Sequence, residues 1–184
     1  MSGSHARAFA IAAYAIQFFY GGWFFYNGLN YFVAITPAPP GSSPLSRELI
    51  GALEHTGLFA IVKAVELATG AALLANRFVP LATVIAFPVS FSIAFVMLIV
   101  NGGVVGTTVG VLVMAFNGVI ALARLDSFRP MLAMHDRAAR APDDRSRTAV
   151  RLSPAAHAAG IILGVGIAFA IEWVTIGHFQ AMAR

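Results

Sequence analysis

Long stretches without a charged residue constrain this chain more than any other feature of its sequence. Residues 8–35, 79–100 and 104–123 contain no Asp, Glu, Lys or Arg, and each is long enough for a transmembrane helix of roughly 20 residues. Only 11% of the 184 residues are charged and 59% are hydrophobic, whereas a soluble domain carries about 25% charged residues. The sequence therefore predicts an all-α integral membrane protein.

Two further apolar segments bring the prediction to five transmembrane helices. Residues 58–75 carry only Lys63 and Glu66 as charged side chains, and residues 155–177 carry only Glu172. The first apolar segment is longer than the apolar core of a signal peptide, about 7–15 residues, so we expect it to be retained as a span. In the third span, Pro88 is expected to bend the helix.

The segments between the spans have the composition of loops and interfacial elements. The stretch "TPAPPGSSP", 36–44, contains four prolines, which exclude a continuous helix. Ser46 is expected to cap a short helix at the membrane interface, with Glu48 in its first turn. Tight connections are expected at "NRF", 76–78, and "NGG", 101–103.

This pattern divides the chain into three parts. Residues 1–124 are expected to form a four-helix membrane core. Residues 125–153 form a basic, water-exposed connector that is partly helical in 127–140, and residues 154–184 form the fifth span and a short outer tail. The stretch 124–153 holds seven Arg and four Asp, a composition that a lipid environment does not tolerate.

The distribution of arginine predicts the orientation of the chain. With the N-terminus inside, nine arginines fall on the inner side, and only Arg47 and Arg184 fall on the outer side. Basic residues near the ends of spans favour the cytoplasmic side, so the C-terminus is expected outside. Because topology accounts for the formal charge of +4, the expected partner is the lipid bilayer and not a nucleic acid.

Two stretches of the sequence resemble the DoxX-like family of small bacterial membrane proteins. They are "FFYGGWFFYNGLNYF", 18–32, and "FAIVKAVELATGAALLANRFVPLA", 59–82. The second stretch has the family's Lys-x-x-Glu-Leu-x-x-Gly run followed by the Asn-Arg-Phe turn, at Lys63, Glu66, Leu67, Gly70 and residues 76–78. Tyr31 stands where the family often has lysine, so no role of that lysine is carried over. The resemblance covers residues 8–124.

The resemblance implies a four-helix bundle in the bacterial inner membrane and an association with redox enzymes. The family is named after a subunit of a thiosulfate:quinone oxidoreductase. We therefore expect an accessory subunit of a membrane redox system that binds a quinone or lipid-like molecule and is not an enzyme by itself. Two alternatives stay open: a small-molecule transporter or binder that uses the charged residues of the spans, and a structural subunit of a larger membrane complex.

Polar residues inside the predicted spans gather in their outer halves. Lys63 lies about five residues, roughly 8 Å, below the outer end of its helix, and Glu66 follows one turn deeper on the same face. Glu172 lies at a similar depth in the fifth span. The candidate ligand-binding or buried polar cluster comprises Lys63, Glu66, Glu172, Asn27, Asn30, Glu54, Tyr20 and Tyr31. No catalytic residue is identified.

Charged side chains inside a membrane need partners, because each costs about 2.5–3.5 kcal/mol near the centre of a helix. We therefore expect Lys63 to face the bundle interior and to pair with Glu66, Glu172 or both. Such a cluster can fix the register of the helices, or it can form a pocket where Lys63 meets an anionic or carbonyl group. A third reading has Lys63 reaching outward to the membrane surface.

Other patterns in the spans concern helix packing. A stripe with 3,4,3,4 spacing in the first span either packs against other helices or lines a pocket for a flat ring; it consists of Gln17, Tyr20, Phe24, Asn27 and Tyr31. Asn117 is expected to bond to a neighbouring helix. The small-xxx-small patterns "GTTVG", 106–110, and "GIILG", 160–164, favour close helix contacts, within one bundle or at a dimer face.

Metal and haem chemistry have little support in the sequence. The absence of cysteine excludes disulfides and Cys-ligated metals. Membrane haem generally needs two histidines that face each other within a bundle, and none of the five histidines lies in the middle of a span. His55 and His178, near the outer surface, are the only candidates for a metal site. A quinone is the cofactor that the sequence leaves open, and haem is not expected.

Overall fold

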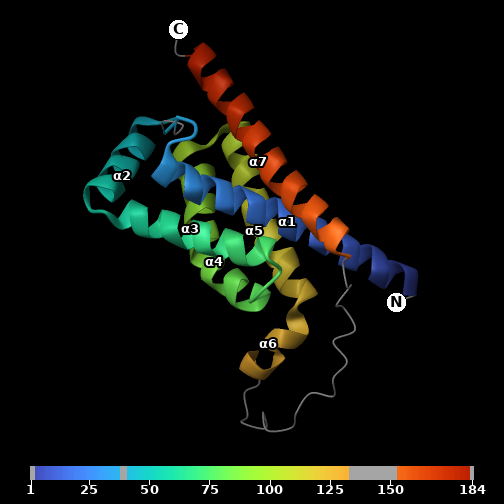
Figure 1. Cartoon of the computed structure of the whole chain (residues 1–184). Helices are drawn as coiled ribbons and strands as arrows, with labels where there is room; N and C mark the ends of the chain where they lie inside the picture. The colour runs from blue at the N-terminus through green and yellow to red at the C-terminus, as the bar shows by residue number, and fades with distance from the viewer. Residues whose placement is uncertain (1–2, 38–40, 133–152, 183–184) are drawn as a thin grey trace.

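The computed structural model describes residues 3–37, 41–132 and 153–182. All regular elements in these residues are helices (Figure 1), which confirms the all-α prediction. They are α1 Gly3–Val33, α2 Pro44–His55, α3 Leu58–Leu74, α4 Val79–Phe95, the π-helix η1 Val96–Asn101, α5 Gly103–Ala123, α6 Leu125–Leu132 and α7 Pro154–Met182.

Four helices of the described chain are long and apolar enough to cross a membrane. They are α1, α4 continued by η1, α5 and α7. The helix α3 has 17 residues and meets α2 at an angle of 88°, and the two pass the same test only as a pair. The structure is therefore that of a multi-pass membrane protein with four clear spans and one bent helix pair.

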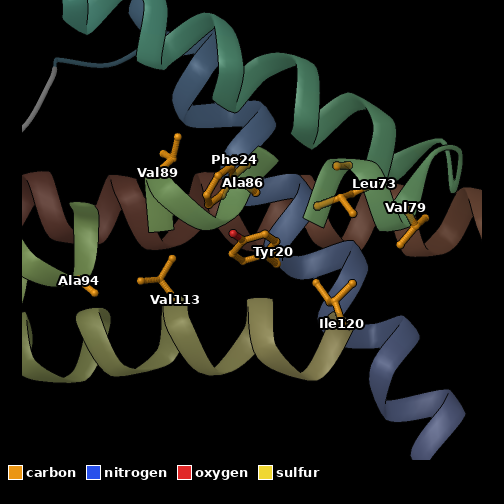
Figure 2. Packing of buried hydrophobic residues seen from close by; sticks show 10 residues of the cluster. Tyr20, Phe24, Leu73, Val79, Ala86, Val89, Ala94, Val113 and Ile120 are labelled. Atoms are coloured by element: carbon orange, nitrogen blue, oxygen red, sulfur yellow. The ribbon is translucent and has the colours of Figure 1, made fainter. Parts of the chain in front are cut away.

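The helix α1 is the centre of the bundle. It packs against α3, α5 and α7, while α4 packs against α5 and α3, and Figure 1 shows α7 crossing α1. Figure 2 shows Tyr20 and Phe24 of α1 lying among side chains that include Ala86 of α4 and Val113 of α5. The predicted stripe on α1 is therefore a packing face at Tyr20 and Phe24.

Large apolar side chains cover the outer surfaces of the long helices. Their exposed members include Phe91 of α4, Leu112 of α5, and Ile162, Ile167 and Val174 of α7. An apolar surface of this extent belongs in lipid rather than in water. The apolar surface therefore agrees with the membrane location that the composition predicts. The polar groups described below lie between the helices.

Glycines set the closest approaches between helices. A Cβ atom added at Gly164 of α7 or Gly22 of α1 would overlap the backbone of the other helix, and one at Gly70 of α3 would overlap α1. Small residues let helix backbones approach in this way. Segment 160–164 therefore packs within the bundle. The same holds for Gly106 and Gly110, which face the end of α4 and η1.

The predicted start of the interfacial helix is wrong by three residues. Ser43, not Ser46, is the N-cap of α2, and the two serines bond each other's backbone N–H at 3.1 Å. Pro44 stands at the first helical position, where its fixed φ and missing N–H suit a helix start. Glu48 consequently lies beyond the first turn, and the side chain of Ser46 is buried.

The third span changes its helix type near its end. The helix continues through Pro88 to Phe95, and the π-helix η1 then leads to the turn that "NGG" predicts. Gly102 and Gly103 have positive φ values of 63° and 71° there, a conformation that glycine adopts without strain. Of the connector, α6 is described, whereas residues 133–152 lie outside the described residues.

Candidate functional site

Lys63 and Glu66 form an ion pair inside the bundle. Lys63 Nζ lies 2.7 Å from Glu66 Oε2, one turn away on α3. The side chain of Glu66 is 3% exposed and that of Lys63 is 16% exposed. Lys63 Nζ also lies 5.1 Å from the centre of the Phe59 ring, in the position of a cation–π contact. Lys63 therefore faces inward and pairs with Glu66, as the sequence predicts.

Glu172 of α7 is the second carboxylate at this level. Its carboxyl group interacts with the side chains of Asn27 and Trp23 on α1, and with Lys63 through charge. Asn27 also donates to the Trp23 carbonyl oxygen at 2.9 Å. Glu172 also interacts electrostatically with Glu66. Three helices, α1, α3 and α7, therefore bring two carboxylates and one ammonium group together. We call Trp23, Asn27, Lys63, Glu66 and Glu172 the outer polar layer, a name that follows the orientation predicted from the sequence.

The positions of these side chains follow from the glycine contacts of α1. A Cβ at Gly28 would overlap the backbone of α3 at Lys63 and Leu67, so this glycine lets Asn27 approach the level of the ion pair. On the other side of α1, Gly164 meets Phe18 and Gly22, which fixes the height of Glu172 eight residues farther along α7. The depth of the outer polar layer is thus set by backbone packing.

Other predicted site residues lie outside the outer polar layer. Asn30 bonds both the carbonyl and the N–H of Thr36, at 3.1 and 2.7 Å, and so closes the loop after α1. Tyr31 is exposed and its ring contacts those of Phe32 and Phe59. Glu54 and His55 are exposed at the end of α2. The side chain of His178 lies outside the described part of the chain.

A second polar centre lies deeper in the bundle and links α1, α4 and α5. Asn117 Nδ2 donates to the Tyr20 hydroxyl at 3.2 Å and to the Thr83 carbonyl oxygen at 3.1 Å. Tyr20 is also hydrogen-bonded to Ser90, and all of these side chains are buried. The predicted bond of Asn117 to a neighbouring helix is confirmed. Tyr20 belongs to this centre and not to the outer polar layer.

A third polar centre, which sequence analysis missed, lies where α3 and α5 end. Gln17 Nε2 donates to the Leu73 carbonyl oxygen at 2.9 Å and to Asn76 Oδ1 at 3.0 Å. Arg124 Nη2 donates to Gln17 Oε1 and Asn76 Oδ1, both at 3.3 Å. Two features of the sequence pointed to this centre: Gln17, an amide inside the first predicted span, and Arg124, directly after the fourth. Arg124 served only as evidence of topology.

The outer polar layer can bind a hydrogen-bond acceptor. An ammonium group has three N–H donors, and Lys63 uses one of them on Glu66. The Lys63 side chain is partly exposed, so part of it can contact a ligand from the membrane. A separate, open apolar hollow of about 370 Å³ lies on α7 and is lined by Phe169, Ala170, Trp173 and Val174.

Comparison of the chain with protein-family models, with curated proteins and with solved structures finds no match. The DoxX-like resemblance of residues 18–32 and 59–82 therefore stays a prediction from the sequence.

Proposed function

We propose that this chain holds a lipid-soluble carbonyl compound, of the quinone class, at the outer polar layer. Its role would be that of an accessory subunit of a bacterial inner-membrane redox system. The observation that carries the proposal is the state of Lys63, a lysine with a partly exposed side chain inside a membrane protein, whose ammonium makes one hydrogen bond, to Glu66, and has N–H donors to spare. The redox association comes from the DoxX-like resemblance.

The charges of the outer polar layer favour a neutral ligand over an anion. Glu66 and Glu172 supply two carboxyl groups against the single ammonium of Lys63. An anionic ligand would add to this excess of negative charge in a medium of low dielectric constant, where like charges repel strongly. A quinone carbonyl accepts a hydrogen bond from Lys63 without adding charge.

The aromatic surroundings suit a flat, apolar ring. Phe59 lies beneath the Lys63 ammonium. On α7, the rings of Phe169 and Trp173 are stacked, with centroids 6.1 Å apart, along the apolar hollow. Binding sites for apolar molecules combine such surfaces with a few polar groups that fix orientation.

We further propose five spans, with the N-terminus inside. In this topology α3 crosses the membrane and α2 lies along the outer interface, so that the 88° bend marks the membrane surface. The alternative is that α2 and α3 enter and leave on one side. Arg77 lies three residues after the end of α3, and its charge favours an inner position for this end of the helix.

A structural role is the second candidate, because the buried carboxylate Glu66 already has its partner. The Tyr20–Asn117 and Gln17–Arg124 centres likewise join helices without an added ligand. In that case the outer polar layer fixes helix positions inside a larger membrane complex. A transporter that uses the same charged residues has no separate observation in its favour.

Photolabelling with an azidoquinone can test the proposal. The full chain, in nanodiscs, should be labelled in α3 or in segment 169–174, and excess unlabelled quinone should suppress the labelling. Lys63→Met should reduce labelling about tenfold or more, because a charge-assisted hydrogen bond is lost. Arg77→Gln, an exposed charge beyond the other end of α3, is the matched control.

Two results would overturn the proposal. One is labelling that unlabelled quinone does not suppress, and the other is equal labelling of a folded Lys63→Met variant. Lys63→Arg keeps the charge and the donors, so it serves as a second test if Lys63→Met does not fold. Extraction of the native preparation should also yield a quinone enriched over the bulk membrane lipid.

A further inference from the structure

Arg124 is a partly buried cation whose hydrogen-bond and ring contacts, among the residues that the structure describes, are with neutral groups. Its Nη2 donates to the amide oxygens of Gln17 and Asn76, and its guanidinium carbon lies 5.3 Å from the centre of the Tyr14 ring. These groups stabilise the guanidinium but do not neutralise it. Burying a charge is costly unless a counter-charge is at hand, so this position calls for an anion.

The three helices that meet at Arg124 hold its side chain at one end of the bundle. Arg124 directly follows α5, where the partial negative charge of a helix C-terminus favours a cation. Asn76 follows α3, thirteen residues after Lys63, or about 20 Å along the helix axis. The Arg124 centre and the outer polar layer therefore lie at opposite ends of α3, and the two sites can be tested independently.

A small hollow lies beside the guanidinium. Its volume is about 10 Å³, and the side chains around it include Phe9, Ala13, Tyr14, Gln17 and Ile120 together with Arg124. This is about the space that one water molecule occupies, so it can receive a single ligand oxygen but not an acyl chain. The lining comes from the membrane-spanning helices α1 and α5.

We propose that Arg124 binds the phosphate group of an anionic phospholipid at this end of the bundle. A guanidinium carries five N–H donors in a planar fork that fits phosphate oxygens, and the bonds to Gln17 and Asn76 use only Nη2. No described residue accepts a hydrogen bond from the remaining donors, which can therefore bind a phosphate at the hollow.

The surroundings favour a lipid over a soluble anion. Phe9 of α1 is 41% exposed and Leu122 of α5 is 62% exposed, so apolar surface lies on both helices next to the cation. Acyl chains can lie along this surface while the phosphate meets Arg124. Basic sites between helices at the cytoplasmic membrane surface bind anionic head groups in this way. This inference does not depend on a quinone at Lys63.

The test uses the full chain, purified and delipidated in detergent. Native mass spectrometry would measure retention of added dioleoylphosphatidylglycerol, with dioleoylphosphatidylcholine and inorganic phosphate as comparison ligands. Wild-type protein should retain phosphatidylglycerol best. Arg124→Gln should weaken that retention about tenfold or more, since charge-assisted bonds are lost, and Arg77→Gln, at an exposed arginine one residue from Asn76, should weaken it less.

Three outcomes would overturn the proposal: equal retention of phosphatidylcholine, equal loss in Arg77→Gln and Arg124→Gln, and displacement of the lipid by millimolar inorganic phosphate. The last outcome would indicate a site for a soluble anion. If Arg124→Gln does not fold, Arg124→Lys decides the matter, because it keeps the charge and loses the planar fork. Phosphatidylglycerol retention that is unchanged in Arg124→Lys would then contradict the phosphate geometry proposed here.

Discussion

The Lys63 ammonium and the Glu66 carboxylate lie 2.7 Å apart, but they are unequally buried, with side-chain exposures of 16% and 3%. The carboxylate depends almost wholly on its partner for stabilisation, whereas the Lys63 side chain is partly exposed. Removing one member therefore has a different consequence from removing the other, and stability measurements can separate the two roles.

Replacing Lys63 with Met should destabilise the protein by about 3–5 kcal/mol, because it leaves a buried carboxylate without its partner. Glu66→Gln should cost less, because the remaining Lys63 side chain is partly exposed. The double variant should be more stable than the sum of the two single effects predicts. Unfolding in mixed detergent micelles measures all three. Purely additive effects would contradict the coupling, and unchanged stability throughout would remove the pair as a structural lock.

The crossing of α1 and α7 should be sensitive at Gly164 and insensitive at Gly166. A side chain at Gly164 would overlap the backbone at Phe18, whereas a Cβ at Gly166 meets nothing within 4 Å. We expect Gly164→Leu to lower the thermal midpoint markedly and Gly166→Leu to leave it nearly unchanged. The emission of the only two tryptophans, Trp23 and Trp173, should shift in the first variant alone. Equal effects would argue against this crossing.

The hydrogen bond between Tyr20 and Asn117 should make a modest contribution to stability. In Tyr20→Phe, Asn117 keeps the Thr83 carbonyl and Ser90 keeps the Ala86 carbonyl as acceptors. The expected loss is about 0.5–1.5 kcal/mol. A double-mutant cycle with Asn117→Leu should give a coupling energy near 0.6 kcal/mol, the average for such bonds within membranes. Zero coupling would show that the contact contributes nothing to stability.

Accessibility of single cysteines can decide between four and five spans. The chain has no cysteine, and Ser42 and Ser127 are both exposed in loop or connector positions. If α3 crosses the membrane, Ser42→Cys and Ser127→Cys lie on opposite sides. A membrane-impermeant maleimide should then label only Ser42→Cys in intact cells and both variants after permeabilisation. If α2 and α3 form a re-entrant pair, both positions lie on the same side and behave alike.

The local parts of the site could be read from the sequence. Lys63 and Glu66 are three residues apart, and helix geometry alone places them on one face. The capping of α2 was misjudged because Ser43 and Ser46 are both plausible caps, and the choice depends on where Pro44 starts the helix. Asn30 was predicted to join the polar cluster, but it bonds to Thr36 instead, and those bonds depend on how the chain turns after α1.

What the sequence by itself determined is the class of molecule. Uncharged runs as long as a bilayer is thick must form helices in lipid, because their backbone groups find no water there. Tertiary structure alone decided which distant side chains meet. Arg124 and Gln17 are 107 residues apart, and Glu172 reaches Asn27 across the α1–α7 crossing. These contacts depend on the rotation of each helix and on its position along the bundle axis. Backbone contacts at Gly28, Gly70 and Gly164 determine both.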